Sequence, residues 1–257
     1  YEDRILVTAE PFGLWVIESS KDISKELPLP DCGLPVIYTD NQKPYKQRKV
    51  RILNGAHTSF VPAAFLCGYD YVLDAMNDPM IKTFMQKTLY DEVIPTLSLP
   101  KDDLMAFAEA VTGRFMNPYI KHALLSICLN SVSKWRARCM PSLLGYVEKT
   151  GKLPEHLTFS LAALMALYHG GKIEEGKLVC QRNGQPYTLQ DDEAVEEFFA
   201  NNSDKPAREM AQMFLSNEAF FGQDLTKIPG LLDSVATSLE DILKRGARTV
   251  MTERFGG

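Results

Sequence analysis

From Lys49 to the C-terminus, apolar side chains recur every three or four positions, and this spacing constrains the fold more than any other feature. The first such stretch, Lys49 to Gly68, carries Val50, Leu53, Ala56, Phe60, Ala64 and Cys67. This spacing places apolar side chains on one face of a helix. We expect further helices at residues 78–94, 100–114, 117–130, 133–148, 157–169, 191–200, 207–215 and 228–244. The pattern predicts a mainly α domain over residues 49–257.

Short local signals define the ends of several of these elements. Asp78-Pro79 combines a capping side chain with a first-turn proline, and Gly246 is placed to end the last helix. Asn183-Gly184 lies between two apolar runs, which predicts a small hairpin over residues 177–189.

The first 48 residues differ from the rest. The runs 14–17 and 35–39 are β-type, a polar stretch rich in proline separates them, and residues 40–48 form a charged connector. The chain begins Tyr1-Glu2-Asp3-Arg4, without a methionine and without the features of a signal peptide, so we expect a fragment. Residues 1–48 are therefore interpreted as a short mixed segment that joins a preceding domain.

Composition excludes several classes of protein. Among 257 residues the net charge is −5, and the only notable Lys/Arg run is 43–51, so a nucleic-acid partner is not expected. The chain lacks an apolar stretch of about 20 residues, so a membrane partner is not expected either. Five widely spaced cysteines without a Cys-x-x-Cys pair indicate reduced thiols in the cytoplasm rather than disulfides or a zinc site.

Phosphate-binding and hydrolase motifs are missing. The 16 glycines include no Gly-x-Gly pair, and neither a Gly-Lys-Ser/Thr loop, a His-Glu-x-x-His nor a Gly-x-Ser-x-Gly motif occurs. We therefore expect no cofactor-binding residues in this chain, so a redox cofactor would be held elsewhere.

Polar residues interrupt the apolar pattern where the first long helix begins. At about 100° per residue, Lys49, Asn54 and His57 would share one face of an α-helix. An ammonium, a carboxamide and an imidazole together can polarise a carbonyl, donate a proton and orient a hydroxyl, and burial would make the lysine a better acid or base. The alternative is structural: Lys49 and Arg51 solvated in the first turn, and His57 a hydrogen-bonded core residue.

The spacing Lys-x-x-x-x-Asn-x-x-His resembles the signature of the mannitol dehydrogenase family, the polyol-specific long-chain dehydrogenases. The strings Lys43 to Thr58 and Ala110 to His122 are similar to one branch of it, the tagaturonate reductases or altronate oxidoreductases. The similarity extends from Thr8–Phe12 to Asp224–Leu231. It implies a helical C-terminal domain of the 6-phosphogluconate dehydrogenase-like type, whose partners are its own N-terminal Rossmann-type domain, holding NAD(H), and a small sugar-acid substrate. No metal is implied.

The resemblance also implies roles for particular residues. Lys49 would be the general acid/base, Asn54 would hydrogen-bond the ketone oxygen, and His57 would bind a neighbouring substrate hydroxyl. Lys134 matches a second substrate-contacting lysine, and its alternative is an ordinary surface lysine.

The family pattern has an arginine eight residues before this lysine, where the chain has Ser126. We expect His122, one helical turn earlier, to form a carboxylate pocket with Lys134, although a capping or packing role would also explain it. Arg114 is either a substrate contact or part of a helix junction.

Several alternatives remain open at this level. A fructuronate reductase or mannitol dehydrogenase would share Lys49, Asn54 and His57, and a helical binding or assembly module would use none of them for chemistry. The preferred substrate, the choice between NADH and NADPH and the oligomeric state are not readable from the sequence.

Overall fold

The computed structural model describes Ile5 and residues 13–256. Residues Tyr1–Arg4 and Thr8–Phe12, which figure in the sequence arguments above, lie outside the described residues. The chain divides into two compact units, residues 1–47 and 48–257.

The described part of the first unit is built around two short parallel strands. Strand β1 (Trp15–Glu18) pairs with β2 (Val36–Thr39), with Trp15 opposite Val36. A 3₁₀ turn, η1 (Pro30–Cys32), lies between them in sequence. The two predicted β-type runs are confirmed. The charged connector is wrong in part, because helix α1 (Lys43–Arg48) occupies most of it, and the Asn41 side chain accepts a bond from the Lys43 amide where that helix begins.

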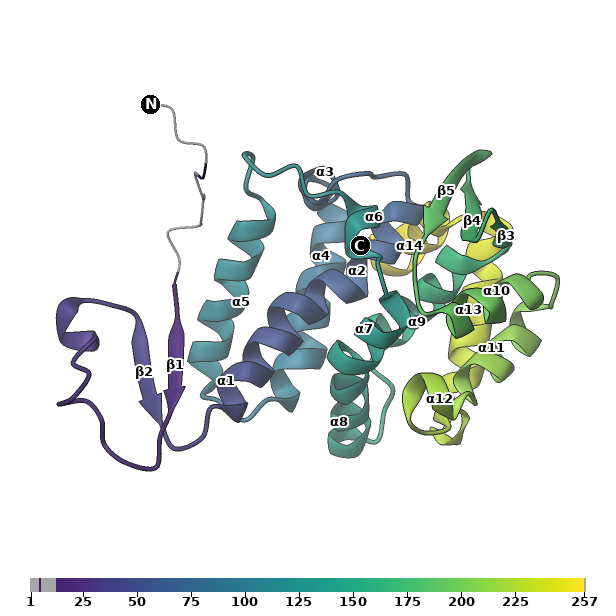
Figure 1. Cartoon of the computed structure of the whole chain (residues 1–257). Helices are drawn as coiled ribbons and strands as arrows, with labels where there is room; N and C mark the ends of the chain where they lie inside the picture. The colour runs from purple at the N-terminus through teal and green to yellow at the C-terminus, as the bar shows by residue number, and fades with distance from the viewer. Residues whose placement is uncertain (1–4, 6–12, 257) are drawn as a thin grey trace. The chain divides into compact units, whose positions relative to one another are not determined.

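The second unit is mainly helical, which confirms the predicted fold class (Figure 1). After α1 the backbone continues without a break through the π-helix η2 (Lys49–Asn54) into α2 (Gly55–Leu66). The elements that follow are α3 (Val72–Asn77), α4 (Pro79–Lys87), the π-helix η3 (Thr88–Val93), η4 (Ile94–Thr96), α5 (Lys101–Phe115), α6 (Leu124–Ile127), α7 (Ser131–Arg138), α8 (Met140–Thr150), α9 (Glu155–Tyr168), α10 (Glu193–Asn201), α11 (Ala207–Leu215), α12 (Glu218–Phe221), η5 (Leu225–Lys227), α13 (Leu231–Arg245) and α14 (Ala247–Phe255).

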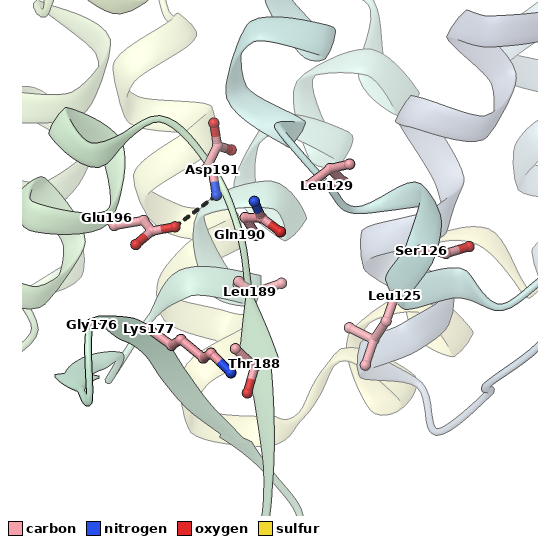
Figure 2. Close-up of a pocket in the computed structure, with 10 residues that line it drawn as sticks. All are labelled: Leu125, Ser126, Leu129, Gly176, Lys177, Thr188, Leu189, Gln190, Asp191 and Glu196. Atoms are coloured by element: carbon pink, nitrogen blue, oxygen red, sulfur yellow. Dashed lines mark hydrogen bonds between the residues drawn. The ribbon is translucent and has the colours of Figure 1, made fainter.

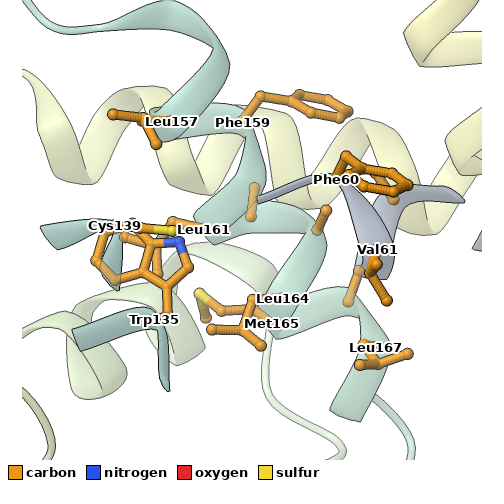
Figure 3. Packing of buried hydrophobic residues seen from close by; sticks show 14 of the residues in the cluster. Phe60, Val61, Trp135, Cys139, Leu157, Phe159, Leu161, Leu164, Met165 and Leu167 are labelled. Carbon is orange, nitrogen blue, oxygen red and sulfur yellow. The ribbon is translucent and has the colours of Figure 1, made fainter. Parts of the chain in front are cut away.

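Helix α9 is the centre of the core. Every residue from His156 to Tyr168 is buried, as expected for a helix that is apolar on all sides. It packs against α2 and α13, and Figure 3 shows Phe60 and Val61 of α2 and Trp135 of α7 close to its side chains. The Trp135 indole donates to the Ser160 hydroxyl (3.0 Å), so the polar group that enters the core is satisfied.

A small antiparallel sheet follows α9. Strands β3 (Lys172–Glu174), β4 (Lys177–Arg182) and β5 (Gln185–Leu189) are joined by two tight turns. Both turns place two residues at positive φ, Glu175-Gly176 and Asn183-Gly184, as type I′ turns require. The predicted hairpin is confirmed, and β3 extends it.

One expected helix was wrong in extent, and another was not the last of the chain. The single helix over 133–148 is two, because α7 ends at Arg138 and Pro141, which has no amide hydrogen to donate, lies in the first turn of α8. Gly246 does end α13 with φ 82°, but a further helix, α14, follows it.

The expected helix over 117–130 is largely wrong. Only Leu124–Ile127 is helical, and the Asn117 side chain instead accepts the Tyr119 amide in a turn. The His122 carbonyl accepts from Val72, and Leu124 donates to the Asp70 carbonyl. Pairing with the segment before α3 therefore takes the backbone bonds that a helix would have used.

The five cysteines are all free thiols, as the sequence predicts. Burial raises the pKa of four of them, Cys67, Cys128, Cys139 and Cys180, to about 12, so these thiols are unreactive at neutral pH.

Candidate active site

The helix that carries the candidate catalytic residues is not a regular α-helix at its start. Within η2 the Gly55 amide bonds to the Val50 carbonyl, an i to i+5 bond. A π segment has more residues per turn than an α-helix, so the 100° spacing used to place Lys49, Asn54 and His57 on one face does not hold here. Single π turns are frequent at functional sites.

Arg51 fixes the orientation of η2. Its side chain is buried and donates to the Ser142 hydroxyl (2.7 Å) and the Thr96 hydroxyl (2.9 Å). The expectation that Arg51 is solvated is wrong. With Arg51 held inside, Lys49 lies exposed, so the burial that would tune this lysine is not supplied by the described residues.

Asn54 and Gly55 form the junction between η2 and α2. Asn54 is half-buried, and its carbonyl accepts the Thr58 hydroxyl (3.0 Å). A Cβ on Gly55 would lie 3.3 Å from the Arg138 carbonyl oxygen, closer than most real contacts. Glycine here allows the end of α7 to approach the start of α2.

His57 packs against the rings of Phe115 and His122. Its imidazole stacks on Phe115 (centroids 3.9 Å apart) and meets His122 edge-on at 5.3 Å. Its Nε2 atom is buried and has no hydrogen-bond partner among the residues that the structure describes. The structural alternative, a fully hydrogen-bonded core histidine, therefore does not describe this side chain.

The surroundings keep His57 neutral. Burial lowers the pKa of His57 to about 3, and His122, Arg138 and Arg114 act in the same direction. At neutral pH the ring therefore has one donor and one acceptor nitrogen. Burial also lowers the pKa of His122, so His122 is not a cation at neutral pH.

Lys134 lies on the other side of a small hollow that His57 and Thr58 also line. The hollow has a volume of about 10 Å³, room for about one water. The Lys134 ammonium donates to the Ile127 carbonyl (3.1 Å), and burial, with Arg138 next, lowers the pKa of Lys134. It is half-buried and bonded rather than an ordinary surface lysine.

The structure thus brings four predicted residues to one place: His57, His122, Lys134 and Arg114, the last through its charge at the end of α5. The helical argument for His122 was wrong, since His122 lies outside any helix and reaches His57 by tertiary packing. In the turn after α5, the Asn117 side chain accepts the Tyr119 amide (3.0 Å).

Sequence reasoning missed Arg138 and Phe115. Arg138 donates to the Thr58 hydroxyl (3.3 Å), and burial lowers the pKa of its guanidinium. It lies four residues after Lys134 on α7, so the two share a face, and this spacing was the available signal. Phe115 gave no signal of its own, because the last apolar residue of a helix resembles any core residue.

His156 is structural, in contrast to His57. The Glu92 carboxylate lies 2.9 Å from His156 Nδ1 and accepts the amides of His156 and Leu157, which caps the start of α9. Its ring packs against Phe84 and Phe255.

A wider cavity of about 720 Å³ lies between α6 and the hairpin (Figure 2). Leu125, Ser126, Lys177 and Glu196 are among its lining residues, so Ser126 faces this cavity rather than the hollow at His57. Its acids are already engaged: Asp191 accepts the Tyr168 hydroxyl (2.5 Å), and Glu196 accepts the Asp191 amide (2.8 Å). Size favours this cavity, but unsatisfied polar chemistry favours the hollow beside His57.

The described residues carry neither a metal-binding cluster nor a membrane-spanning helix. They contain no cluster of three or more His, Cys, Asp or Glu side chains placed to hold a metal ion. Within the same residues, no helix has the length and apolarity needed to span a membrane.

The fold and these side chains define a helical domain in which a Lys/Asn/His motif lies beside a small hollow lined by His57 and Lys134. The family model of the mannitol dehydrogenase C-terminal domain matches residues 41–243, and the chain belongs to this family.

Relatives with named activities are about twice as long. The chain is 48% identical over 254 residues to an altronate oxidoreductase of Klebsiella pneumoniae (strain 342), covering 96% of this chain and 50% of that protein. It is 46% identical to an altronate oxidoreductase of Escherichia coli (strain K12) over the same shares. The chain therefore spans about half the length of the curated relatives it matches.

Solved structures share the fold. Pseudomonas fluorescens mannitol 2-dehydrogenase, in a ternary complex with NAD and D-mannitol, superposes with a TM-score of 0.77 at 24% identity over 95% of this chain and 46% of that one. A substrate-free D-sorbitol dehydrogenase gives 0.68 at 20% identity, over 87% and 43% respectively. At these identities the likeness concerns the fold.

Proposed function

We propose that this chain is the substrate-binding half of an NAD-dependent oxidoreductase that interconverts tagaturonate and altronate. The observation that carries the proposal is the group of side chains around His57, whose imidazole has a nitrogen without a partner among the described residues and lies close to Lys134, Arg138 and Arg114. His57 follows Lys49 and Asn54 on one continuous run of helix. A sugar acid has hydroxyls that could bond to the imidazole nitrogen and a carboxylate that could bind the positive charges. The names and lengths of the altronate oxidoreductase relatives support the same choice.

The other half of the enzyme would be an N-terminal Rossmann-type domain. NADH bound there would supply the hydride. The described residues offer no glycine-rich phosphate loop, so none of them is assigned to the cofactor. A domain placed over η2 would also cover the exposed Lys49 and give it the dry surroundings that acid/base catalysis by lysine requires.

The chain's own residues would handle the proton and the orientation. As a hydride adds to the ketone carbon, the carbonyl electron pair moves to oxygen, and the Lys49 ammonium gives that oxygen its proton. Asn54 would donate a hydrogen bond to the same oxygen as its charge develops. Neutral His57 would bind the neighbouring hydroxyl through its free Nε2.

Lys134 and His122 would form the carboxylate end of the pocket, and Arg114 would add to its positive potential. Lys134 and His122 are both half-buried beside His57, and the field of Arg114 reaches the same ring.

The test is NADH oxidation by the two-domain protein with tagaturonate, fructuronate and fructose in parallel. We expect tagaturonate turnover to exceed the others by at least about tenfold. A clear preference for fructuronate or fructose would overturn the substrate assignment and leave the proposed Lys49 chemistry in place. No turnover of any of the three would favour a binding module.

A further inference from the structure

The charge around His57 is one-sided. The groups that act on its pKa are His122, Arg138 and Arg114, and each of them favours the neutral ring. The Asp191 carboxylate acts to raise the pKa of Lys134. Asp191, however, already accepts bonds from the Tyr168 hydroxyl and the Val132 amide. The two cations of α7 at this place, Lys134 and Arg138, therefore have no uncommitted carboxylate opposite them among the described residues.

Lys134 lines this hollow, and Arg138, four residues later on the same face of α7, bonds to Thr58, which also lines it. Among the described residues, Arg138 is held by the Thr58 hydroxyl and Lys134 by the Ile127 carbonyl, and neither forms an ion pair. Both partners are neutral oxygens. A half-buried guanidinium without an acid has lost part of its hydration and gained little in return.

We propose that Arg138, together with Lys134, binds the carboxylate of the substrate and so makes Arg138 the residue that selects sugar acids over neutral sugars. This inference rests on the proposed function. An arginine suits the task because its planar fork can donate two parallel bonds to a carboxylate, and at least one edge remains for substrate while Nη1 holds Thr58.

Arg136 offers a matched control on the same helix. It is exposed, and its guanidinium lies at Gly222 and near the Ala219 carbonyl of α12, away from the His57 hollow. Replacing it removes the same charge from α7 but touches nothing in the site.

The experiment compares Arg138→Gln and Arg136→Gln in the two-domain protein, with tagaturonate turnover and with inhibition by altronate and by its neutral counterpart altritol. We expect Arg138→Gln to lower kcat/KM for tagaturonate about 100-fold, mainly through KM, and to weaken altronate inhibition by a similar factor. Altritol inhibition should change by less than about threefold. Arg136→Gln should change none of these by more than about twofold.

Arg138→Lys separates charge from shape. It keeps the positive charge but loses the fork, so we expect an intermediate loss of about tenfold for tagaturonate. Denaturant midpoints of all variants test whether a folding defect causes these losses.

Equal losses for altronate and altritol would overturn the inference, because a merely structural Arg138 would not distinguish acid from alcohol. No loss for either would overturn it as well. If the unaltered protein turns over no ketohexuronate, the proposed function itself fails; if it does and Arg138→Gln matches Arg136→Gln, only this inference fails.

Discussion

The two π-helical segments, η2 and η3, each lie near a histidine whose buried Nε2 has no hydrogen-bond partner among the described residues, but the two histidines differ in the groups that surround the rest of the ring. His156 meets Glu92 of η3, which also accepts two backbone amides, in a closed cluster among phenylalanines. His57, three residues after η2, meets positive charges and a phenylalanine, and its Nε2 lacks a partner in the described part of the chain.

His156 is bound through Nδ1 to a carboxylate that also caps a helix, whereas no carboxylate acts on the pKa of His57. The Glu92 carboxylate accepts backbone amides at the start of α9, so a side chain of the same chain satisfies this helix end. Near His57, Lys134 and Arg138 bond to neutral oxygens among the described residues. Residue type alone would not distinguish these two sites; the identity of the neighbours does.

Replacement of Lys49 at the start of η2 should give the largest effect. We expect Lys49→Met to lower kcat of the NAD-linked reaction about 1,000-fold, because the proton donor to the ketone oxygen is lost. Stability should change little, since the side chain is exposed. Steady-state kinetics and urea unfolding measure the two quantities.

The matched control is Lys87→Met. Lys87 is an exposed lysine immediately before η3, one position earlier relative to its π-helical segment than Lys49 is relative to η2. Its replacement should leave kcat within about twofold. Unchanged turnover in Lys49→Met, or equal losses in both variants, would refute the catalytic role of Lys49.

Replacement of Glu92, in the closed cluster around His156, should change stability rather than activity. Glu92→Gln replaces one of two accepting oxygens with an amide NH₂, which then faces a backbone N–H of α9. We expect the free energy of unfolding to fall by about 3 kcal/mol, as for other buried charged hydrogen-bond networks. Urea denaturation at pH 7.5 measures this loss.

Asp91→Asn serves as its control, because Asp91 is the exposed neighbour of Glu92 on the same segment. It should cost less than about 0.5 kcal/mol. A similar small cost for Glu92→Gln would mean that the cap on α9 contributes little.

A smaller effect concerns pH. The pKa of His57 is lowered from 6.5 to about 3 in the folded chain. As pH falls below 6.5, the unfolded chain binds a proton at this residue while the folded chain does not, so stability falls with pH until about pH 3.

Between pH 7.5 and 5.5 this residue should cost the protein about 1 kcal/mol of stability. His57→Gln has no such proton to bind, so its stability should decline less over the same interval by that amount. Urea unfolding of both proteins at the two pH values makes the comparison, and parallel declines would contradict a lowered pKa.

Sequence alone predicted the elements that short-range chemistry defines. The Asp78 side chain accepts the Met80 amide, and Asn183-Gly184 makes the hairpin turn, both from adjacent residues. Helix α11 matched its expected bounds because its apolar spacing is regular and Pro206 precedes it.

What the sequence could not predict depends on distant partners. His122 is not helical, because its carbonyl accepts the Val72 amide and the Leu124 amide donates to the Asp70 carbonyl. The π turn in η2 follows from tertiary packing around Arg51, whose partners are Thr96 and Ser142. In the same way, the motif Lys49, Asn54 and His57 was found by resemblance, whereas Arg138 entered the site only once α7 was packed beside α2.

The most direct test of the central claim is a crystal structure of the two-domain protein with NAD⁺ and altronate. The account predicts the altronate carboxylate within hydrogen-bond distance of the Arg138 guanidinium and the Lys134 ammonium, with the oxidisable hydroxyl at Lys49 and Asn54. Altronate bound with its carboxylate away from Arg138, or in the cavity beside the hairpin, would contradict it.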